Sequence, residues 1–184
     1  MNMQSTMHGE LIDQQTLRFE RLLPSPIERV WDYLTKAELR AKWFADGEME
    51  PKNGSALTLV WRNDELGARP GSPPEHMKGF GGTHQSQNVV LAWEPPHRLV
   101  FDWSDGIDNG RSQVEFLLEA EGDKVRLTLT HSRLSKSDNR YKFASGWHIH
   151  LLMLSELLAG DVKSNFWESF DGMPLVYAKR FEGK

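Results

Sequence analysis

The sequence of 184 residues contains no cysteine, and this absence excludes several classes of protein. Without thiols there is no disulfide framework, no thiol nucleophile and no cysteine-based zinc site. The composition fits a reducing compartment, and we expect a cytoplasmic location. No run of about 18 apolar residues occurs, so no membrane-spanning helix is predicted. The first residues lack a charged segment followed by an apolar core, so we expect no signal peptide.

An excess of charge of one sign is also missing. The chain has 22 Lys and Arg residues against 26 Asp and Glu residues, a formal net charge of −4. Proteins that hold nucleic acid through its phosphates present a basic face. We therefore expect no nucleic-acid partner. The length suits one domain, which we assign to residues 16–184, preceded by a flexible arm at residues 1–15.

Patterns typical of catalytic or metal sites are lacking as well. His148 and His150 are two residues apart, so on a helix they point in different directions and cannot chelate one metal. The glycines at 79–82 are not followed by the Lys and Ser or Thr of a phosphate-binding loop, and no nucleophile elbow surrounds Ser132. We assign no catalytic residue, no metal and no cofactor.

Aromatic residues and helix-start signals are concentrated at residues 25–44. Ser25 with Glu28, and Thr35 with Glu38, have the spacing of a capping box, in which the hydroxyl and the carboxylate satisfy backbone N–H groups reciprocally. Pro26 suits the first helical position, where its missing N–H costs nothing. We predict a short helix that begins at Pro26 and a second that restarts at Thr35.

Most of the remaining chain alternates between apolar and polar residues, as β-strands do. Such segments lie at residues 16–23, 56–62, 79–84, 85–93, 98–104, 113–120 and 124–132. We predict a long exposed loop at residues 63–78 and a hairpin loop at residues 105–110, which contain Asp-Gly and Asn-Gly. Helical periodicity covers residues 144–159 and ends at Gly160. The apolar tail, residues 165–181, is expected to pack back on the domain and to end in a short helix.

This element order predicts an α+β fold, in which the long C-terminal helix covers the apolar face of a curved antiparallel sheet. The two short helices lie between strands one and two. The edge strands and the apolar tail would permit a homodimer.

Several segments, in their order and spacing, resemble a known family. They are Pro24, Ser25 and Pro26 with Val30, Trp31, Leu34, Thr35, Trp43 and Phe44; residues 95–99 with Phe101 and Trp103; residues 127–131; and Gly146 with Trp147. They resemble the SRPBCC (START-like, Bet v 1-like) superfamily, and more narrowly the domain related to the activator of heat-shock protein 90 ATPase. The resemblance implies a helix-grip fold with a hydrophobic cavity beneath the long helix. It does not imply one activity, because the superfamily includes lipid carriers, cyclases, resistance proteins and chaperone regulators.

Strand parity and helix periodicity predict which side chains face that cavity. The predicted ligand-binding residues are Trp31, Trp43, Phe44, Trp61, Phe80, Phe101, Trp103, Phe116, Leu129, His131, Trp147, Leu151 and Leu154. His131 is the polar candidate among them. It either contacts a ligand or is a core histidine satisfied by a backbone carbonyl or a nearby side chain.

Three functions follow as hypotheses. The leading one is non-enzymatic binding of a small, apolar or aromatic ligand, with His131 and Trp147 near its polar end. The second is a protein-interaction module that acts as a co-chaperone-like regulator. The third is a cyclase- or hydrolase-type enzyme that uses His131 as acid or base.

Overall fold

The computed structural model describes residues 7–104, 111–135 and 140–183, so the hairpin loop expected at residues 105–110 lies outside the described residues. The described residues form one seven-stranded antiparallel sheet in the order β1-β2-β7-β6-β5-β4-β3. Its strands are β1 (Glu10–Asp13), β2 (Thr16–Pro24), β3 (Ala56–Trp61), β4 (His84–Glu94), β5 (Arg98–Trp103), β6 (Ser112–Glu121) and β7 (Lys124–Ser132).

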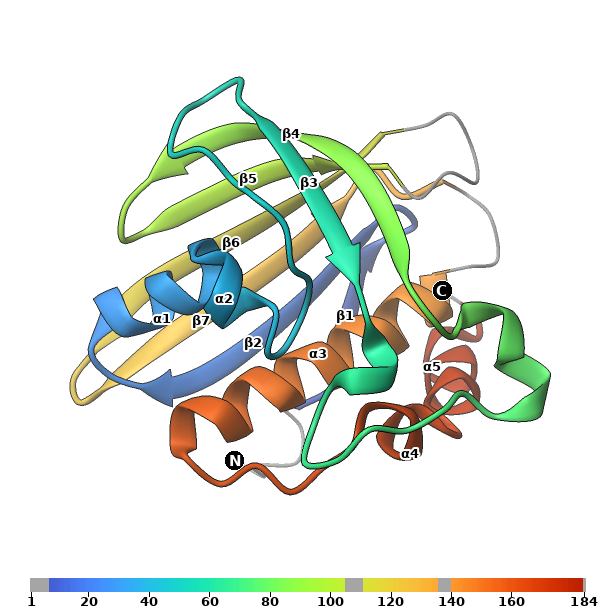
Figure 1. Ribbon diagram of the computed structural model, residues 1–184. Helices are drawn as coiled ribbons and strands as arrows, with labels where there is room; N and C mark the ends of the chain where they lie inside the picture. Colours follow the sequence, from blue (N-terminus) through green and yellow to red (C-terminus); the bar gives the residue numbers. More distant parts are fainter. Residues whose placement is uncertain (1–6, 105–110, 136–139, 184) are drawn as a thin grey trace.

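Helices lie beside this sheet and in the loops between its strands. They are α1 (Ile27–Thr35), α2 (Ala37–Arg40), α3 (Arg140–Ala159), α4 (Phe166–Phe170) and α5 (Met173–Phe181), with 3-10 helices η2 (Asn63–Glu65) and η3 (Glu75–Phe80). Figure 1 shows α3 beneath the curved sheet, with α4 and α5 beside it. The predicted α+β helix-grip arrangement is confirmed.

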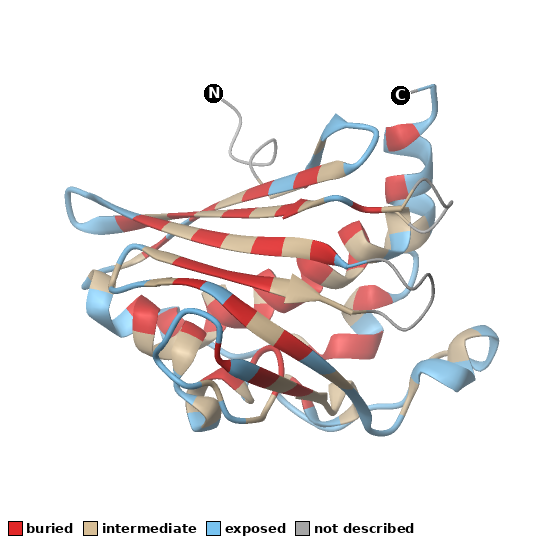
Figure 2. Cartoon of the chain, turned by 90° about the horizontal axis from the view of Figure 1, so that it is seen from above, coloured by how far each residue is buried: buried red, intermediate tan, exposed pale blue. Residues whose placement is uncertain are grey.

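The sheet has one buried and one solvated face, because successive side chains of a strand point to opposite sides. Phe19 of β2 is paired with Leu129 of β7, which is paired with Phe116 of β6, and all three are buried. Along the strands, buried residues alternate with half-buried or exposed ones (Figure 2). The core therefore lies between the concave face and α3.

Helix α3 is buried on more than its sheet-facing side. Leu151 and Leu154 are buried, and so are His148 and Ile149 on other faces of the helix. The reason is that α3 packs against β2 and also against α4 and α5. The apolar tail thus forms two helices that pack against α3, and the prediction that it packs back on the domain is confirmed.

The helix break at Thr35 is confirmed, but the two capping boxes are wrong. The residues before the helices are Pro26 and Lys36, and neither helix has a side-chain cap. Thr35 remains in the last turn of α1, where its hydroxyl donates to the carbonyl of Trp31 at 2.8 Å. This local bond competes with capping of the next helix.

Three further segments differ from expectation. The arm predicted at residues 1–15 contains a strand, because Leu11 of β1 pairs with Leu17 of β2. Residues 63–78 are not a plain loop, since they include η2 and most of η3. The strand predicted at 79–84 is wrong, because η3 extends to Phe80 and β4 begins only at His84.

Candidate functional site

An aromatic cluster occupies the space between the sheet and α3. Its side chains come from several strands, from α3 and from the segment after α2. Its members are Trp43 and Phe44 after α2, Trp61 of β3, Trp103 of β5, Phe116 of β6 and Trp147 of α3. The ring of Phe44 is stacked on that of Trp147 at 5.1 Å and 25°, and on that of Trp43 at 5.3 Å. Trp103 lies 5.5 Å from Trp147 and 5.2 Å from Trp61. Six of the predicted residues therefore lie together.

His131 lies at the edge of this cluster with both ring nitrogens bonded to protein groups. The indole Nε1–H of Trp147 donates to Nδ1 at 3.0 Å, so the ring proton is on Nε2 and is directed to Ser112 Oγ at 2.8 Å. The side chain is fully buried, and burial lowers its pKa from 6.5 to about 3. A neutral histidine held in this way favours the core-histidine interpretation, with side chains as the partners.

The other predicted residues occupy different places. Phe101, Leu129, Leu151 and Leu154 are buried in the same core. Trp31 lies apart from the cluster, where its ring contacts that of Trp93 at 5.3 Å.

The prediction that Phe80 faces the cavity is wrong, because its side chain is 52% exposed. The cause is local. The segment predicted as a strand instead contains the end of η3 and the residues that lead into β4, which begins only at His84.

An open cleft of about 430 Å³ lies between the β3 edge of the sheet and the second half of α3. Its apolar wall is formed by Phe44, Leu66, Met153, Leu157 and Val162. Phe44 is the one predicted residue in this wall, and it also belongs to the aromatic cluster. Sequence reasoning missed Leu66 and Val162 because each is a lone apolar residue in a polar loop. The apolar character of these two isolated residues was the only sign in the sequence that they are part of a site.

Charged residues on the cleft lining are balanced in sign: Lys42 and Arg62 against Asp46 and Glu65. Arg62 Nη1 lies 3.2 Å from Asp46 Oδ2. The backbone N–H of Gly47, followed by Arg62, lowers the pKa of Asp46. The lining therefore combines one apolar wall with charged residues of balanced sign.

Buried Arg40 holds the turn that forms one side of the cleft. Its Nε donates to the carbonyl of Ala45 at 3.1 Å, its Nη1 to that of Thr35 at 3.0 Å, and its Nη2 to that of Gly47. Burial lowers the pKa of Arg40 to about 10, so it remains charged at neutral pH. Gly47 has φ 107°, and a Cβ there would lie 2.1 Å from the carbonyl oxygen of Thr58. The turn therefore requires glycine at this position.

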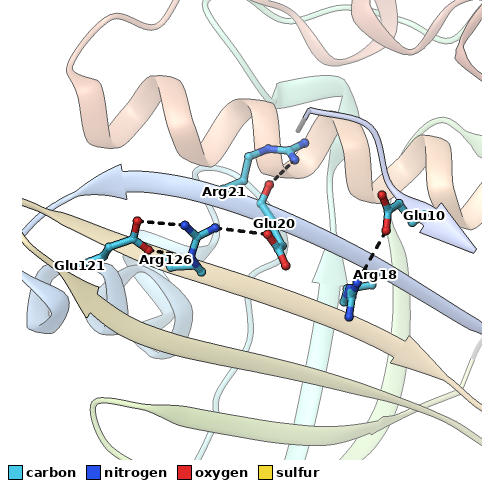
Figure 3. A network of polar contacts seen from close by, with 6 residues as sticks. All are labelled: Glu10, Arg18, Glu20, Arg21, Glu121 and Arg126. Atoms are coloured by element: carbon cyan, nitrogen blue, oxygen red, sulfur yellow. Dashed lines mark hydrogen bonds and ion pairs between the residues drawn. The ribbon is translucent and has the colours of Figure 1, made fainter. Parts of the chain in front are cut away.

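The outer face of the sheet shows a separate polar network (Figure 3). Arg126 lies between Glu121 at 2.7 Å and Glu20 at 3.2 Å, and Arg18 lies 3.7 Å from Glu10. These groups are substantially exposed, so each pair contributes little to stability. We assign this network to the solvated surface and not to the candidate site.

An antiparallel sheet that curves around one long helix, with two short helices after the first long strand, defines the helix-grip class of α+β proteins. The family described as Activator of Hsp90 ATPase homolog 1-like protein matches residues 24–159, and the chain belongs to this family. No curated protein matches the chain. Over the described ranges, no helix is both long and apolar enough to cross a membrane.

Solved structures show the same fold. The protein encoded by BPP1335 of Bordetella parapertussis is 37% identical, with a TM-score of 0.80 over 95% of this chain and 90% of that one. CalU16 of Micromonospora echinospora is 20% identical, with a TM-score of 0.63 over 94% and 93%. EF2215 of Enterococcus faecalis, described as a conserved protein of unknown function, is 16% identical, with a TM-score of 0.68 over 97% and 94%.

Proposed function

We propose that this protein binds a small, mostly apolar or aromatic molecule in the cleft between the β3 edge and α3. The observation that supports it is the cleft itself, whose volume of about 430 Å³ is within the range of small-molecule sites. One wall of the cleft is apolar, and the charged residues in the rest of the lining are balanced in sign. Phe44 connects this wall to the aromatic cluster, whose packing against Phe44 gives the wall a rigid backing.

The lowered pKa and the hydrogen bonds of His131 fit a protein that binds a ligand without catalysing a reaction. A general acid or base needs a pKa near the working pH and a free nitrogen. The pKa of His131 is lowered to about 3, and its nitrogens are engaged by Ser112 and Trp147. Its role here is to hold Trp147 in the wall behind Phe44.

A cleft-filling variant tests this function. Val162 is 39% exposed in the cleft wall, so Val162→Phe should narrow the cleft with little effect on folding. Titration with naphthalene or indane, followed by tryptophan fluorescence, should show saturable binding to the unmodified protein. We expect the variant to bind at least about tenfold more weakly, which corresponds to ~1.4 kcal/mol.

The matched control is Val176→Phe on α5. Val176 is 40% exposed and is not part of the cleft lining. The Val176→Phe variant should bind naphthalene and indane with the same affinity as the unmodified protein. Absence of saturable binding by the unmodified protein would refute the proposed function, and equal affinity of Val162→Phe would refute the position of the site.

A further inference from the structure

The cleft has two charged side chains of opposite sign that pair with no other side chain among the described residues. Of the four charged residues in its lining, Arg62 and Asp46 form an ion pair at 3.2 Å. Lys42 and Glu65 line the same cleft, but neither side chain has a hydrogen bond or an ion pair within the described ranges. Both residues are exposed, so a ligand in the cleft can contact their charged groups.

Each of these two charges adjoins the apolar wall along the chain. Lys42 follows α2 and lies two residues before Phe44, whereas Glu65 ends η2 and directly precedes Leu66. Phe44 and Leu66 are 2% and 5% exposed, so each charge is carried by backbone that a buried neighbour holds in place. A ligand that rests on the apolar wall would therefore have a cation and an anion beside it.

This arrangement limits the head group that a ligand can have. A hydrocarbon would displace water from Lys42 and Glu65 and would supply no partner in exchange, which costs free energy. A lone carboxylate would pair with Lys42 but would be repelled by Glu65, and a lone ammonium would have the reverse conflict. A head group that carries both charges, and is neutral overall, gives each side chain a partner.

We infer that the ligand is an α-amino acid with an apolar or aromatic side chain, whose carboxylate pairs with Lys42 and whose ammonium pairs with Glu65. This inference rests on the proposed function and adds the class of ligand to it. The side chain of the amino acid lies on the apolar wall, and the two ion pairs orient its head group. The pair between Arg62 and Asp46 stays intact.

Four compounds with one skeleton and different charged groups test the head group. They are indane, 2-aminoindane, indane-2-carboxylate and 2-aminoindane-2-carboxylate, each titrated at neutral pH and low salt and followed by tryptophan fluorescence. We expect the amino acid, 2-aminoindane-2-carboxylate, to bind about three- to tenfold more tightly than indane and more tightly than either singly charged compound. Added salt should reduce this advantage, because the ion pairs are exposed.

Two substitutions at exposed positions assign the charges separately. Lys42→Gln should weaken binding of the two carboxylate compounds about two- to fivefold, and Glu65→Gln should do the same for the two amino compounds. Neither substitution should change the affinity for indane. The matched controls, Lys52→Gln and Glu119→Gln, remove exposed charges outside the cleft lining and should leave all four affinities unchanged.

The outcomes separate the inference from the function on which it rests. Equal affinity of the unmodified protein for all four compounds would overturn the amino-acid head group while leaving the apolar site in place. An affinity for the amino acid that either Lys42→Gln or Glu65→Gln leaves unchanged would also overturn it, as would tighter binding of a singly charged compound. If none of the four compounds binds the unmodified protein, the proposed function itself fails.

Discussion

At the scale of single residues, buried histidines show how an aromatic interior accommodates polar atoms. His150 is 6% exposed, and its Nδ1 lies 2.8 Å from the carbonyl of Trp43, to which it donates. His131 instead accepts from Trp147 and donates to Ser112. Each ring is neutral and tied to a residue that shapes the aromatic cluster. These bonds set the positions of the rings behind the cleft.

Ser112→Ala tests one of these bonds. The substitution leaves the Nε2–H of His131 buried without an acceptor, so we expect the free energy of unfolding to fall by about 1–3 kcal/mol. Urea denaturation measures the change. The control is Ser132→Ala, at a half-buried position beside His131, which should cost less than about 0.5 kcal/mol. Equal effects of the two variants would contradict the assigned role of Ser112.

At the scale of elements, one hydroxyl joins three parts of the fold. Tyr177 of α5 is fully buried, accepts from the backbone N–H of Gly9 at 2.8 Å and donates to His148 Nδ1 of α3 at 2.9 Å. Gly9 lies directly against the ring of Phe19, where a Cβ would come within 2.2 Å of a ring atom. The start of β1, the long helix and the last helix are thus held at one point. Residues 9 and 177 both lie outside the family match at 24–159.

Tyr177→Phe should loosen this junction. It deletes the partner of both the Gly9 N–H and His148 Nδ1, so we expect a loss of about 1–3 kcal/mol in unfolding free energy. Hydrogen exchange should show faster exchange of the Gly9 amide, because its acceptor is gone. Tyr33→Phe, at a half-buried tyrosine of α1, is the control and should leave that amide protected. Unchanged protection in Tyr177→Phe would argue against the junction.

At the scale of the whole molecule, the buried histidines make stability depend on pH. Burial lowers the pKa of His131 from 6.5 to about 3, and lowers the pKa values of His148 and His150 to about 4. The unfolded chain takes up protons at these groups below pH 6.5, whereas the folded protein does so only near pH 4 and below. Their contribution to stability is therefore complete above about pH 6.5 and is lost progressively as the pH falls toward 4.

Acidification from pH 7.5 to 5.5 should lower the free energy of unfolding by about 1.4 kcal/mol for each of the three histidines. Urea titrations at several pH values measure this slope. His148→Gln should reduce the slope by about one third, and His76→Gln, at an exposed histidine, should leave it unchanged. Stability that stays constant or rises on acidification would contradict the neutral state of the buried rings.

Prediction from the sequence succeeded for features that repeat along one element. The alternation at residues 124–132 identified β7, because burial there follows the period of the strand. Leucine spacing identified α3, although this helix is also buried on sides that its leucine spacing does not mark. It failed for Phe80 and for the capping boxes, where a 3-10 turn and a competing backbone bond of Thr35 replaced the expected geometry. The cleft was missed because Leu66 and Val162 have no periodic neighbours.

The sequence by itself determined that a curved antiparallel sheet covers a long helix, since strand and helix periodicities are local properties that choose the buried faces. The tertiary structure decided where side chains fill space and where they leave it open. Phe44, Trp103 and Trp147 meet from three distant segments, and their volumes close the interior while a cleft remains at the sheet edge. Lys42 and Glu65 likewise line one cleft only because the fold brings their segments together, which no local pattern encodes.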